Sequence, residues 1–236
     1  MADLKLNGIT PDGVGKIKVG NTNVQKIYNG DELVWPSSLG PGEVQVCSLI
    51  WKKSNSTTLA KVGGGSIDFA TNADDWANAH TNQIPTACYF EFDSSKASYG
   101  LIYNYWAKSV IQPPTGFRLP SQDDLSELTA CYGTNDNPLG ADPGVWDTSL
   151  LTNTIGLGTS GFNAHGYGFA YVGYTPSEPV SWVNKGRVEL YWGDNNYLSA
   201  LQGIHVQFYT NGHLRQVTYS NSNKDMSTFI RFVKDE

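Results

Sequence analysis

Hydrophobic and polar positions alternate with a period of two along much of this chain, a pattern that favours β-strands over helices. In residues 1–36 the alternation is interrupted at Gly20 to Asn23 and at Asn29-Gly30, which predicts a turn at the first place and a hairpin at the second. We therefore expect short strands at 16–19, 24–28 and 31–35. A piece of this size is too small to bury its own core, so it should depend on a partner.

A Pro-, Ser- and Gly-containing segment at 37–43 predicts a linker, and residues 44–236 follow it with a different composition. Helical spacing occurs at 73–80 and at 121–132, where Ser121 is the expected N-cap and Asp124 the third helical residue. The better strand patterns lie at 44–51, 87–92, 168–173, 187–192, 204–209, 214–219 and 229–233. The expected fold class is α+β, with one or two helices against irregular antiparallel sheet.

Composition narrows the classes of partner. The 236 residues have a net charge of −6 and no cluster of Lys and Arg, so no nucleic-acid partner is expected. We find no apolar stretch long enough to span a bilayer and no signal-peptide core in residues 1–8. A polar, weakly charged chain of this kind suits work outside a cell, and release of virions by lysis is one route that needs no export signal.

The three cysteines, Cys47, Cys88 and Cys131, lie far apart and have no CxxC spacing. This pattern implies neither a zinc site nor a dense disulfide framework. We expect three buried free thiols that act as small hydrophobic residues, and the sequence leaves one disulfide open.

Five segments in chain order carry a family resemblance: Ser98–Ala107, Gly116–Ser121, Gly161–Ala164, Glu189–Trp192 and Phe229–Asp235. Together they resemble the Fibrobacter succinogenes major paralogous domain, a branch of the C-type-lectin-like fold related to sulfatase-modifying enzymes and to phage variable receptor-binding proteins. The resemblance implies a C-type-lectin-like domain over residues 44–236. We interpret its signature residues as positions that hold the fold rather than bind a ligand: Trp106, Gly116, Phe117, Arg118, Leu119, Pro120, Gly161, Phe162 and Asn163.

Arg118 has a specific structural expectation. It stands beside a predicted strand end, where a buried guanidinium can hold several backbone carbonyls with its five N–H donors. Pro120 should then end the strand and place the Ser121 cap.

Residues 1–36 carry a second resemblance, through Val19–Thr22, Val24–Gly30 and Leu33–Trp35. These segments are similar to a short module of tailed-phage structural proteins. The resemblance implies that residues 1–36 attach the chain to other virion proteins, and that the chain forms a homotrimer or homodimer.

Catalysis is not expected. The related sulfatase-modifying enzymes need a pair of cysteines near the C-terminus, whereas no cysteine follows Cys131 here. No GxSxG or P-loop pattern occurs. The four histidines, which have neither HExxH nor facial-triad spacing, are His80, His165, His205 and His213.

Calcium is the one cofactor with any sequence support. Lectins of the broader fold ligate Ca²⁺ with Glu-Pro-Asn and Trp-Asn-Asp motifs. This chain has Glu178-Pro179-Val180, with no side-chain oxygen at the third position, and Trp192-Gly193-Asp194, with an inserted glycine. We interpret both as coincidence and expect no cofactor, and we keep Glu178 and Asp194 as calcium candidates.

Aromatic residues interleaved with Asn and Asp crowd the segment from Tyr167 to Tyr219. Aromatic faces stack on sugar rings, and amides beside them supply hydrogen bonds, although core packing must account for about half of these rings. The predicted ligand-binding residues are Trp182, Asn184, Trp192, Asp194, Asn195, Asn196 and Tyr197.

These observations predict a non-catalytic bacteriophage virion protein, a head or tail fibre or a decoration protein, that displays a lectin-like domain to host-surface or mucosal glycans or proteins. Many copies on one particle would turn weak affinities into useful avidity. Two alternatives stay open at this point: a secreted or cell-surface bacterial carbohydrate-binding module, and a purely structural capsid or tail protein with no glycan ligand.

Overall fold

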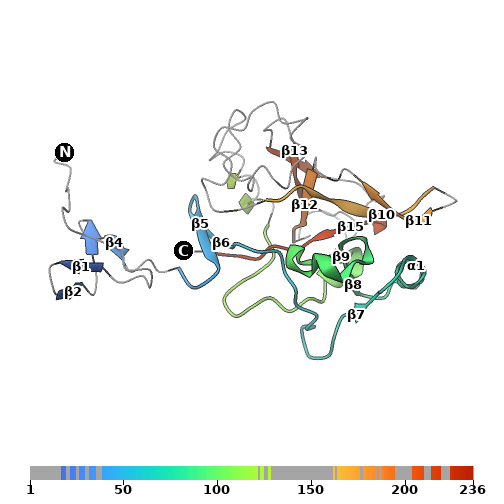
Figure 1. The fold of residues 1–236 in the computed structure, drawn as a ribbon, viewed down its shortest axis with the longest axis horizontal. Coiled ribbons are helices and arrows are strands. Elements are labelled where there is room, and N and C mark those ends of the chain that lie inside the picture. The colour runs from blue at the N-terminus through green and yellow to red at the C-terminus, as the bar shows by residue number, and fades with distance from the viewer. Residues whose placement is uncertain are drawn as a thin grey trace. The chain divides into compact units, whose positions relative to one another are not determined.

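The computed structural model describes four short strands before residue 36 and then residues 39–121, 123–124, 127–128, 162, 164–175, 178–183, 185, 188–194, 204–209, 214–218 and 224–235. The chain divides into two compact units, Met1–Pro41 and Gly42–Glu236. Their boundary falls within the segment that the sequence predicts as a linker. The fold is α+β, built mostly of sheet with few helices, as the sequence predicts (Figure 1).

The first unit contains two separate antiparallel hairpins. Strand β1 (Ile17–Val19) pairs with β2 (Thr22–Val24), and β3 (Ile27–Asn29) pairs with β4 (Glu32–Trp35). The hairpin expected around Asn29-Gly30 is confirmed, and Asn29 is the last residue of its first strand. The turn predicted over Gly20 to Asn23 is wrong in its second half, because Thr22 and Asn23 pair with β1. A β-branched Thr is favoured in a strand, and two residues suffice to connect a hairpin.

Nine strands of the second unit form one sheet among the described residues. Their order is β14-β13-β12-β10-β15-β9-β8-β7, with β11 paired to β10. The pairing is mixed, since β7–β8, β10–β12 and β12–β15 are parallel. The strands are β7 (Asp68–Phe69), β8 (Thr86–Tyr89), β9 (Leu101–Asn104), β10 (Tyr167–Thr175), β11 (Glu178–Val183), β12 (Val188–Trp192), β13 (Ile204–Tyr209), β14 (Leu214–Thr218) and β15 (Met226–Phe229).

A smaller sheet of β5 (Glu43–Val46), β6 (Leu49–Lys52) and β16 (Val233–Asp235) joins the first and last described strands of this unit. The single strand predicted over 44–51 is wrong, because the chain turns between β5 and β6 at Cys47, whose φ is 61°. The strand predicted over 229–233 is also wrong, since it covers the gap between β15 and β16. In both places the apolar run continues through the break.

The helices follow local capping signals. Helix α1 (Ala73–Thr81) begins after Asn72, whose side chain accepts a hydrogen bond from the N–H of Asp75 at 2.9 Å. Helix α2 (Tyr105–Lys108) begins after Asn104. Ser121 and Asp124 cap each other as predicted, with the Asp124 N–H 3.2 Å from Ser121 Oγ and the Ser121 N–H 2.6 Å from Asp124 Oδ2.

The strand predicted over 87–92 ends early. After β8 the chain forms two 3₁₀ turns, η1 (Phe90–Phe92) and η2 (Ser94–Tyr99). Glu91 and Phe92 have φ values of 56° and 58°, in a region that non-glycine residues seldom adopt. The alternation of apolar residues through Phe90 and Phe92 therefore does not mark a strand.

Strands β8, β9 and β15 of the nine-stranded sheet are buried on both faces. Ala87 and Cys88 are neighbours on β8 but belong to different hydrophobic clusters, as do Tyr191 and Trp192 on β12. Successive side chains of a strand point to opposite faces of the sheet, so the two clusters cover its two faces. Strands that are buried on both faces appear in the sequence as continuous apolar runs. The sequence pattern therefore does not predict which face of the sheet contacts a ligand.

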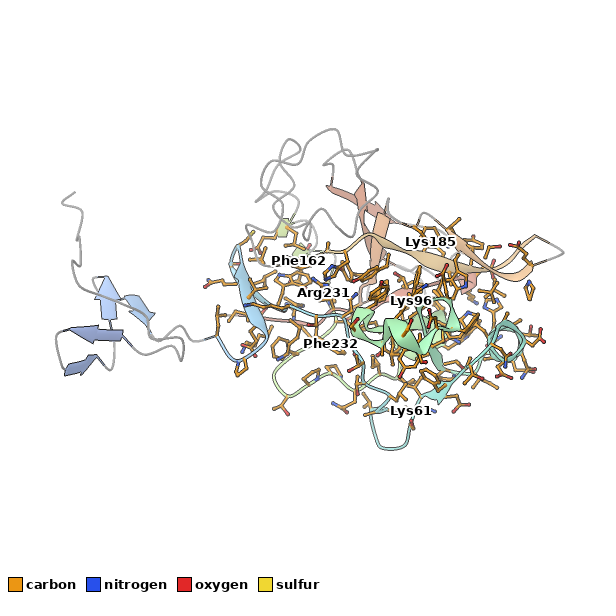
Figure 2. All side chains as sticks on the ribbon, in the orientation of Figure 1. Lys61, Lys96, Phe162, Lys185, Arg231 and Phe232 are labelled. Carbon is orange, nitrogen blue, oxygen red and sulfur yellow. The ribbon has the colours of Figure 1, made fainter. Side chains whose placement is uncertain are left out.

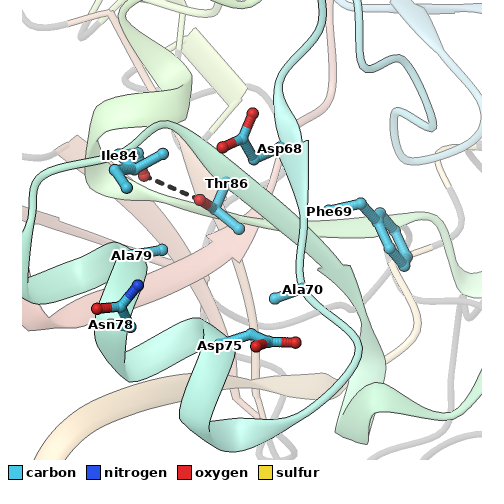
Figure 3. Close-up of a pocket in the computed structure, with 8 residues that line it drawn as sticks. All are labelled: Asp68, Phe69, Ala70, Asp75, Asn78, Ala79, Ile84 and Thr86. Atoms are coloured by element: carbon cyan, nitrogen blue, oxygen red, sulfur yellow. Dashed lines mark hydrogen bonds between the residues drawn. The ribbon is translucent and has the colours of Figure 1, made fainter.

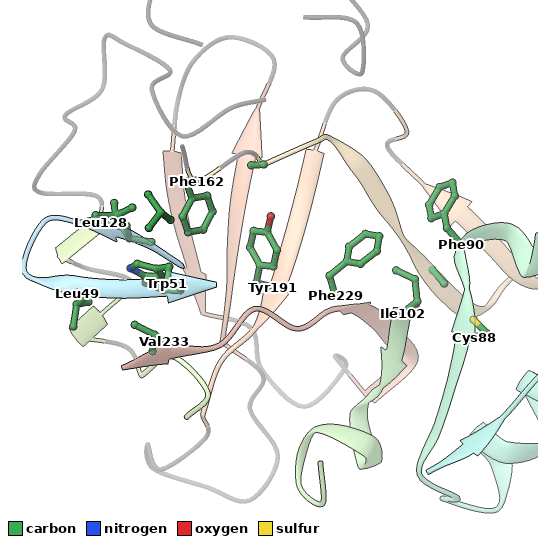
Figure 4. Packing of buried hydrophobic residues seen from close by; sticks show 14 of the residues in the cluster. Leu49, Trp51, Cys88, Phe90, Ile102, Leu128, Phe162, Tyr191, Phe229 and Val233 are labelled. Atoms are coloured by element: carbon green, nitrogen blue, oxygen red, sulfur yellow. The ribbon is translucent and has the colours of Figure 1, made fainter. Parts of the chain in front are cut away.

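One of the two clusters joins the smaller sheet to the larger one (Figure 4). Its rings meet edge to face, with ring centroids 5.3 Å apart for Trp51 and Phe162 and 5.9 Å apart for Phe162 and Tyr191. Phe229 and Ile102 continue the cluster along the larger sheet. Such edge-to-face pairs add about 0.5–1.5 kcal/mol each beyond the burial of their area.

Arg231 lies at the centre of the fold with 0% of its surface exposed. Its Nε and Nη2 donate to Asn55 Oδ1 at 3.1 and 2.6 Å, and its Nη1 donates to the carbonyl of Phe162. The guanidinium lies over the rings of Phe162 and Tyr191, 4.5 and 4.8 Å from their centroids (Figure 2). Arg231, rather than Arg118, is therefore the buried arginine among the described residues, and it joins one backbone carbonyl to one side-chain amide oxygen.

Gly100 packs against the residue that anchors Arg231. Its φ is 89°, and a Cβ at this position would lie 2.5 Å from the Cβ of Asn55. Asn55 Nδ2 also donates to the carbonyl of Tyr99 at 2.9 Å, which fixes the two segments against each other. Only glycine fits both the backbone conformation and the contact.

We expect Gly100→Ala to lower the free energy of unfolding by about 2–3 kcal/mol, because it adds a steric overlap to the strain of a positive φ. Gly63→Ala is the matched control, since Gly63 has a φ of 82° and no atom within 4 Å of the added Cβ. Urea denaturation of both variants separates the two effects. Equal losses of stability would show that the contact with Asn55 imposes no constraint.

Candidate functional site

The structure divides the predicted ligand-binding residues into three groups. Trp192 is fully buried and its Nε1 donates to the carbonyl of Tyr103 at 2.9 Å. Its predicted role in ligand binding is therefore wrong, because its strand alternates into the core. Trp182 and Asp194 are partly exposed. The other predicted residues lie outside the described part of the chain: Asn184, Asn195, Asn196 and Tyr197.

Asp194 lies close to a buried lysine. Its backbone N–H donates to the carbonyl of Pro120 at 2.7 Å, and its carboxylate acts electrostatically on Lys108. Lys108 is 4% exposed, and its Nζ stands 4.6 Å from the ring centroid of Tyr105 and 4.7 Å from that of Trp192. Burial lowers the pKa of Lys108 to about 7, although the Asp194 carboxylate opposes that shift.

Each calcium candidate interacts with a described residue. The carboxylate of Asp194 interacts electrostatically with the ammonium group of Lys108. Glu178 is exposed at the start of β11, where its carboxylate accepts a hydrogen bond from Ser181 Oγ at 3.1 Å. In the part of the chain that the structure describes, no three His, Cys, Asp or Glu side chains are grouped so that they could hold a metal ion.

Trp182 belongs to a group of rings that we call the aromatic cluster: Phe90, Phe92, Tyr99, Tyr167 and Trp182. Phe90 is buried at its centre, 4.9 Å from Trp182 between ring centroids, and the other four rings are partly exposed. Tyr99 and Tyr167 stack face to face at 3.8 Å with an angle of 7° between their planes. Trp182 also meets the edge of Phe92 at 5.5 Å.

Three charged residues border the aromatic cluster. The carboxylate of Glu91 accepts hydrogen bonds from both Lys96 and Lys185, which extend from η2 and from the segment between β11 and β12 (Figure 2). Partial burial raises the pKa of Glu91, but the bonds from Lys185 and Lys96 outweigh it and hold that pKa below its ordinary value. The border therefore presents two ammonium groups around one ionised carboxylate.

This arrangement can bind a ligand without catalysing a reaction. Partly exposed rings offer apolar faces and edges, while the ammonium groups and the carboxylate can exchange hydrogen bonds with hydroxyl or carboxylate groups. Of its members, the sequence identifies only Trp182. The positions of the neighbouring rings Phe90 and Phe92 depend on the left-handed backbone conformations of Glu91 and Phe92. The pattern of residue types does not predict these conformations.

The signature residues occupy varied places. Phe162 is buried in the core, and Pro120 is buried and accepts the hydrogen bond from Asp194. Phe117 has the ammonium groups of Lys52 and Lys234 at 4.1 and 5.0 Å from its ring centroid. Trp106 and Leu119 pack at the margin of a hydrophobic cluster, Gly116 is exposed, and Gly161 and Asn163 lie outside the described residues.

Arg118 is not the buried carbonyl clamp that the sequence predicts. Its guanidinium is 40% exposed and pairs with the carboxylates of Asp124 and Asp235. Among the described residues, one carbonyl, that of Leu119, accepts from it, at 3.3 Å. The backbone of Arg118 instead forms a β-bridge with Val233, which ties the segment before the Ser121 cap to the last strand. The guanidinium thus links the buried carboxylate of Asp124 to the exposed carboxylate of Asp235.

The cysteines differ from the expectation of three free thiols. Cys47 is disulfide-bonded, whereas Cys88 is a buried free thiol whose pKa burial raises. Cys131 lies outside the described residues. The even spread of the three cysteines along the chain gave no sign that Cys47 is paired.

Comparison of the chain with known protein families, with curated proteins and with solved structures finds no match. Among the described helices, none has the length and the apolar surface that crossing a membrane requires.

Proposed function

We propose that this chain is a bacteriophage virion structural protein, without catalytic activity, whose larger unit has a C-type-lectin-like fold and binds host-surface glycans. Residues 1–36 would attach it to other virion proteins in a dimer or trimer. The division into a hairpin unit and a larger sheet unit supports an anchor-and-display arrangement, and the segments from Ser98–Ala107 to Phe229–Asp235 support the fold assignment.

The aromatic cluster with its charged border carries the binding part of the proposal. Sugars present apolar faces that stack on rings and hydroxyl groups that need hydrogen-bond partners. Tyr99, Tyr167 and Trp182 supply partly exposed rings, and Lys185, which is 54% exposed, supplies an ammonium group beside them. Two ammonium groups against one carboxylate favour neutral or anionic sugars. Display of many copies on one particle strengthens weak binding at each site.

Glycan arrays probed with and without EDTA test this function. We expect Tyr99→Leu, which keeps apolar volume and removes the flat ring, to weaken binding about two- to tenfold per site. Lys185→Ala should weaken binding to anionic glycans in particular. Lys53→Ala is the matched control, because Lys53 is exposed and lies outside the aromatic cluster.

Mass spectrometry of purified particles tests the virion role. Absence of the protein from particles, together with glycan binding by the secreted protein, would favour the bacterial carbohydrate-binding module. Presence in particles without any glycan bound, at any calcium concentration, would leave the purely structural role and contradict the adhesin proposal.

A further inference from the structure

A second place in the larger unit has the chemistry of a small-ligand site. A pocket of about 160 Å³ opens between β7, α1 and the start of β8 (Figure 3). The aromatic cluster does not contribute to it. Its lining residues are Asp68, Phe69, Ala70, Asp75, Asn78, Ala79, Ile84 and Thr86.

The carboxylates in this pocket retain the capacity to bind. Asp68 is exposed, and its carboxylate makes no hydrogen bond or ion pair within the described residues. Asp75 Oδ2 accepts from Asn72 Nδ2 at 2.7 Å, which leaves Asp75 Oδ1 without a hydrogen bond from any described residue. No Lys, Arg or His lines the pocket. Its charged lining is therefore wholly negative, opposite in sign to the border of the aromatic cluster.

The pocket also has neutral polar groups above an apolar floor. Asn78 Oδ1 accepts from Asn82 Nδ2 at 2.9 Å, while Asn78 Nδ2 has no acceptor among the described residues. Thr86 is 2% exposed, and its Oγ1 donates to the carbonyl of Ile84 at 2.9 Å, which leaves that oxygen able to accept. Methyl groups of Ala70 and Ala79 line the same pocket.

No aromatic ring serves as a stacking platform here. The ring of Phe69 points away from the other lining residues (Figure 3) and packs edge to face against Tyr89, with centroids 5.0 Å apart. Recognition in this pocket must therefore come from charge and hydrogen bonds. A ligand that fits has a cationic group for the Asp68 carboxylate and hydroxyl groups for the amide and the threonine oxygen, while Asp75 adds negative charge at the other end of the pocket (Figure 3).

We propose that this pocket binds a single amino-sugar ring through its free ammonium group, with Asp68 as the charge partner and Asn78 and Thr86 as hydroxyl partners. The inference rests on the proposed glycan-binding function and adds to it a second subsite of opposite charge preference. N-acetylation removes the ammonium charge, and a uronic acid reverses the ligand's charge, so both should bind more weakly.

Amide chemical shifts of the full-length ¹⁵N-labelled protein, titrated with glucosamine, N-acetylglucosamine, glucuronic acid and ethanolamine, test this inference. We expect glucosamine to shift the amides of residues 68–70, 75–79 and 86, and each of the other three ligands to bind at least about tenfold more weakly. Asp68→Asn should weaken glucosamine binding about tenfold. Asp74→Asn is the matched control, because it removes the same charge from an exposed residue of α1 that does not line the pocket.

Three outcomes overturn the inference: equal binding of N-acetylglucosamine, equal binding of ethanolamine, and equal weakening by Asp68→Asn and Asp74→Asn. The two proposals fail separately. Loss of array binding in Tyr99→Leu without any glucosamine shift at the pocket contradicts only the amino-sugar subsite. Glucosamine shifts at the pocket, with no array glycan whose binding depends on Tyr99, contradict only the function proposed for the aromatic cluster.

Discussion

Replacing Arg231 by Met is expected to lower the free energy of unfolding by about 3–5 kcal/mol. The guanidinium is the donor to Asn55 Oδ1 and to the carbonyl of Phe162, and both residues are buried. A buried acceptor that loses its donor costs about 1–3 kcal/mol. The guanidinium also contacts two ring faces, and each such contact contributes about 0.5–2 kcal/mol.

One effect acts in the opposite direction. Removing a buried cation also removes the free energy needed to take it out of water, and methionine fills much of the same volume. We expect the loss to dominate, because the variant removes the donors and keeps both acceptors buried, instead of removing donors and acceptors together. Arg231→Lys keeps the positive charge and an N–H donor, so its free energy of unfolding should lie between those of the wild type and Arg231→Met.

Urea denaturation followed by tryptophan fluorescence measures the effect. Lys53→Met is the matched control, since it removes an exposed cation and should change stability by less than about 0.5 kcal/mol. If Arg231→Met were as stable as Lys53→Met, the contacts of the guanidinium would only balance its desolvation. The assignment of Arg231 as the residue that holds Asn55 and Phe162 together would then be wrong.

Replacing Lys108 by Met is expected to have the opposite sign. Lys108 is buried, its Nζ has no hydrogen-bond partner in the described part of the chain, and burial lowers its pKa from 10.5 to about 7. Below pH 7 the folded protein must therefore keep the Lys108 ammonium group buried and charged, without a hydrogen bond from it to any described residue. We therefore expect Lys108→Met to raise the free energy of unfolding by about 2–4 kcal/mol at pH 6. The variant also loses the cation–π contacts of Lys108 with Tyr105 and Trp192, and this loss reduces the gain in stability.

The pH dependence gives this prediction a second readout. The folded-state pKa of Lys108 lies below its unfolded value, so between pH 7 and 10.5 the unfolded chain binds more protons at this site. Lys108 therefore makes wild-type stability rise with pH in that window. Lys108→Met lacks this rise, and its advantage over the wild type should shrink by about 2–3 kcal/mol between pH 6 and pH 9.

Denaturation at pH 6, 7, 8 and 9 measures the difference between the two proteins. Taking the difference cancels other groups that titrate in alkali, such as the Cys88 thiol, whose pKa burial raises. Lys53→Met again serves as the control. A constant difference across this pH range would mean that Lys108 does not deprotonate in the fold.

The sequence predicted elements where one signal acted alone. Residues 204–209 alternate without interruption and form β13 with those bounds, and Ser121 and Asp124 exchange the predicted capping hydrogen bonds, although most of the helix predicted over 121–132 lies outside the described residues. It failed where a non-glycine residue adopts a left-handed backbone. Cys47 and Glu91 do so inside apolar runs, so the strands expected at 44–51 and 87–92 are broken. A residue type cannot report a conformation that tertiary contacts impose.

The candidate site was harder to predict for a related reason. When both faces of a sheet are buried, every aromatic residue of a strand has a core to enter, and alternation does not say which rings reach the surface. Trp182 and Trp192 look alike in the sequence, yet one lies in the aromatic cluster and the other is buried. Lys96 and Lys185 come from segments that are distant in the sequence, and both pair with Glu91.

The small β5–β6–β16 sheet gives the larger unit a defined response to mechanical force. Because β6 is antiparallel to both of its neighbours, β5 and β16 run in the same direction. Glu43 begins β5 and Asp235 ends β16, so two opposite forces that pull these residues apart act along the strands. Hydrogen bonds between strands lie across that direction, so the pull shears them together instead of peeling them apart one by one.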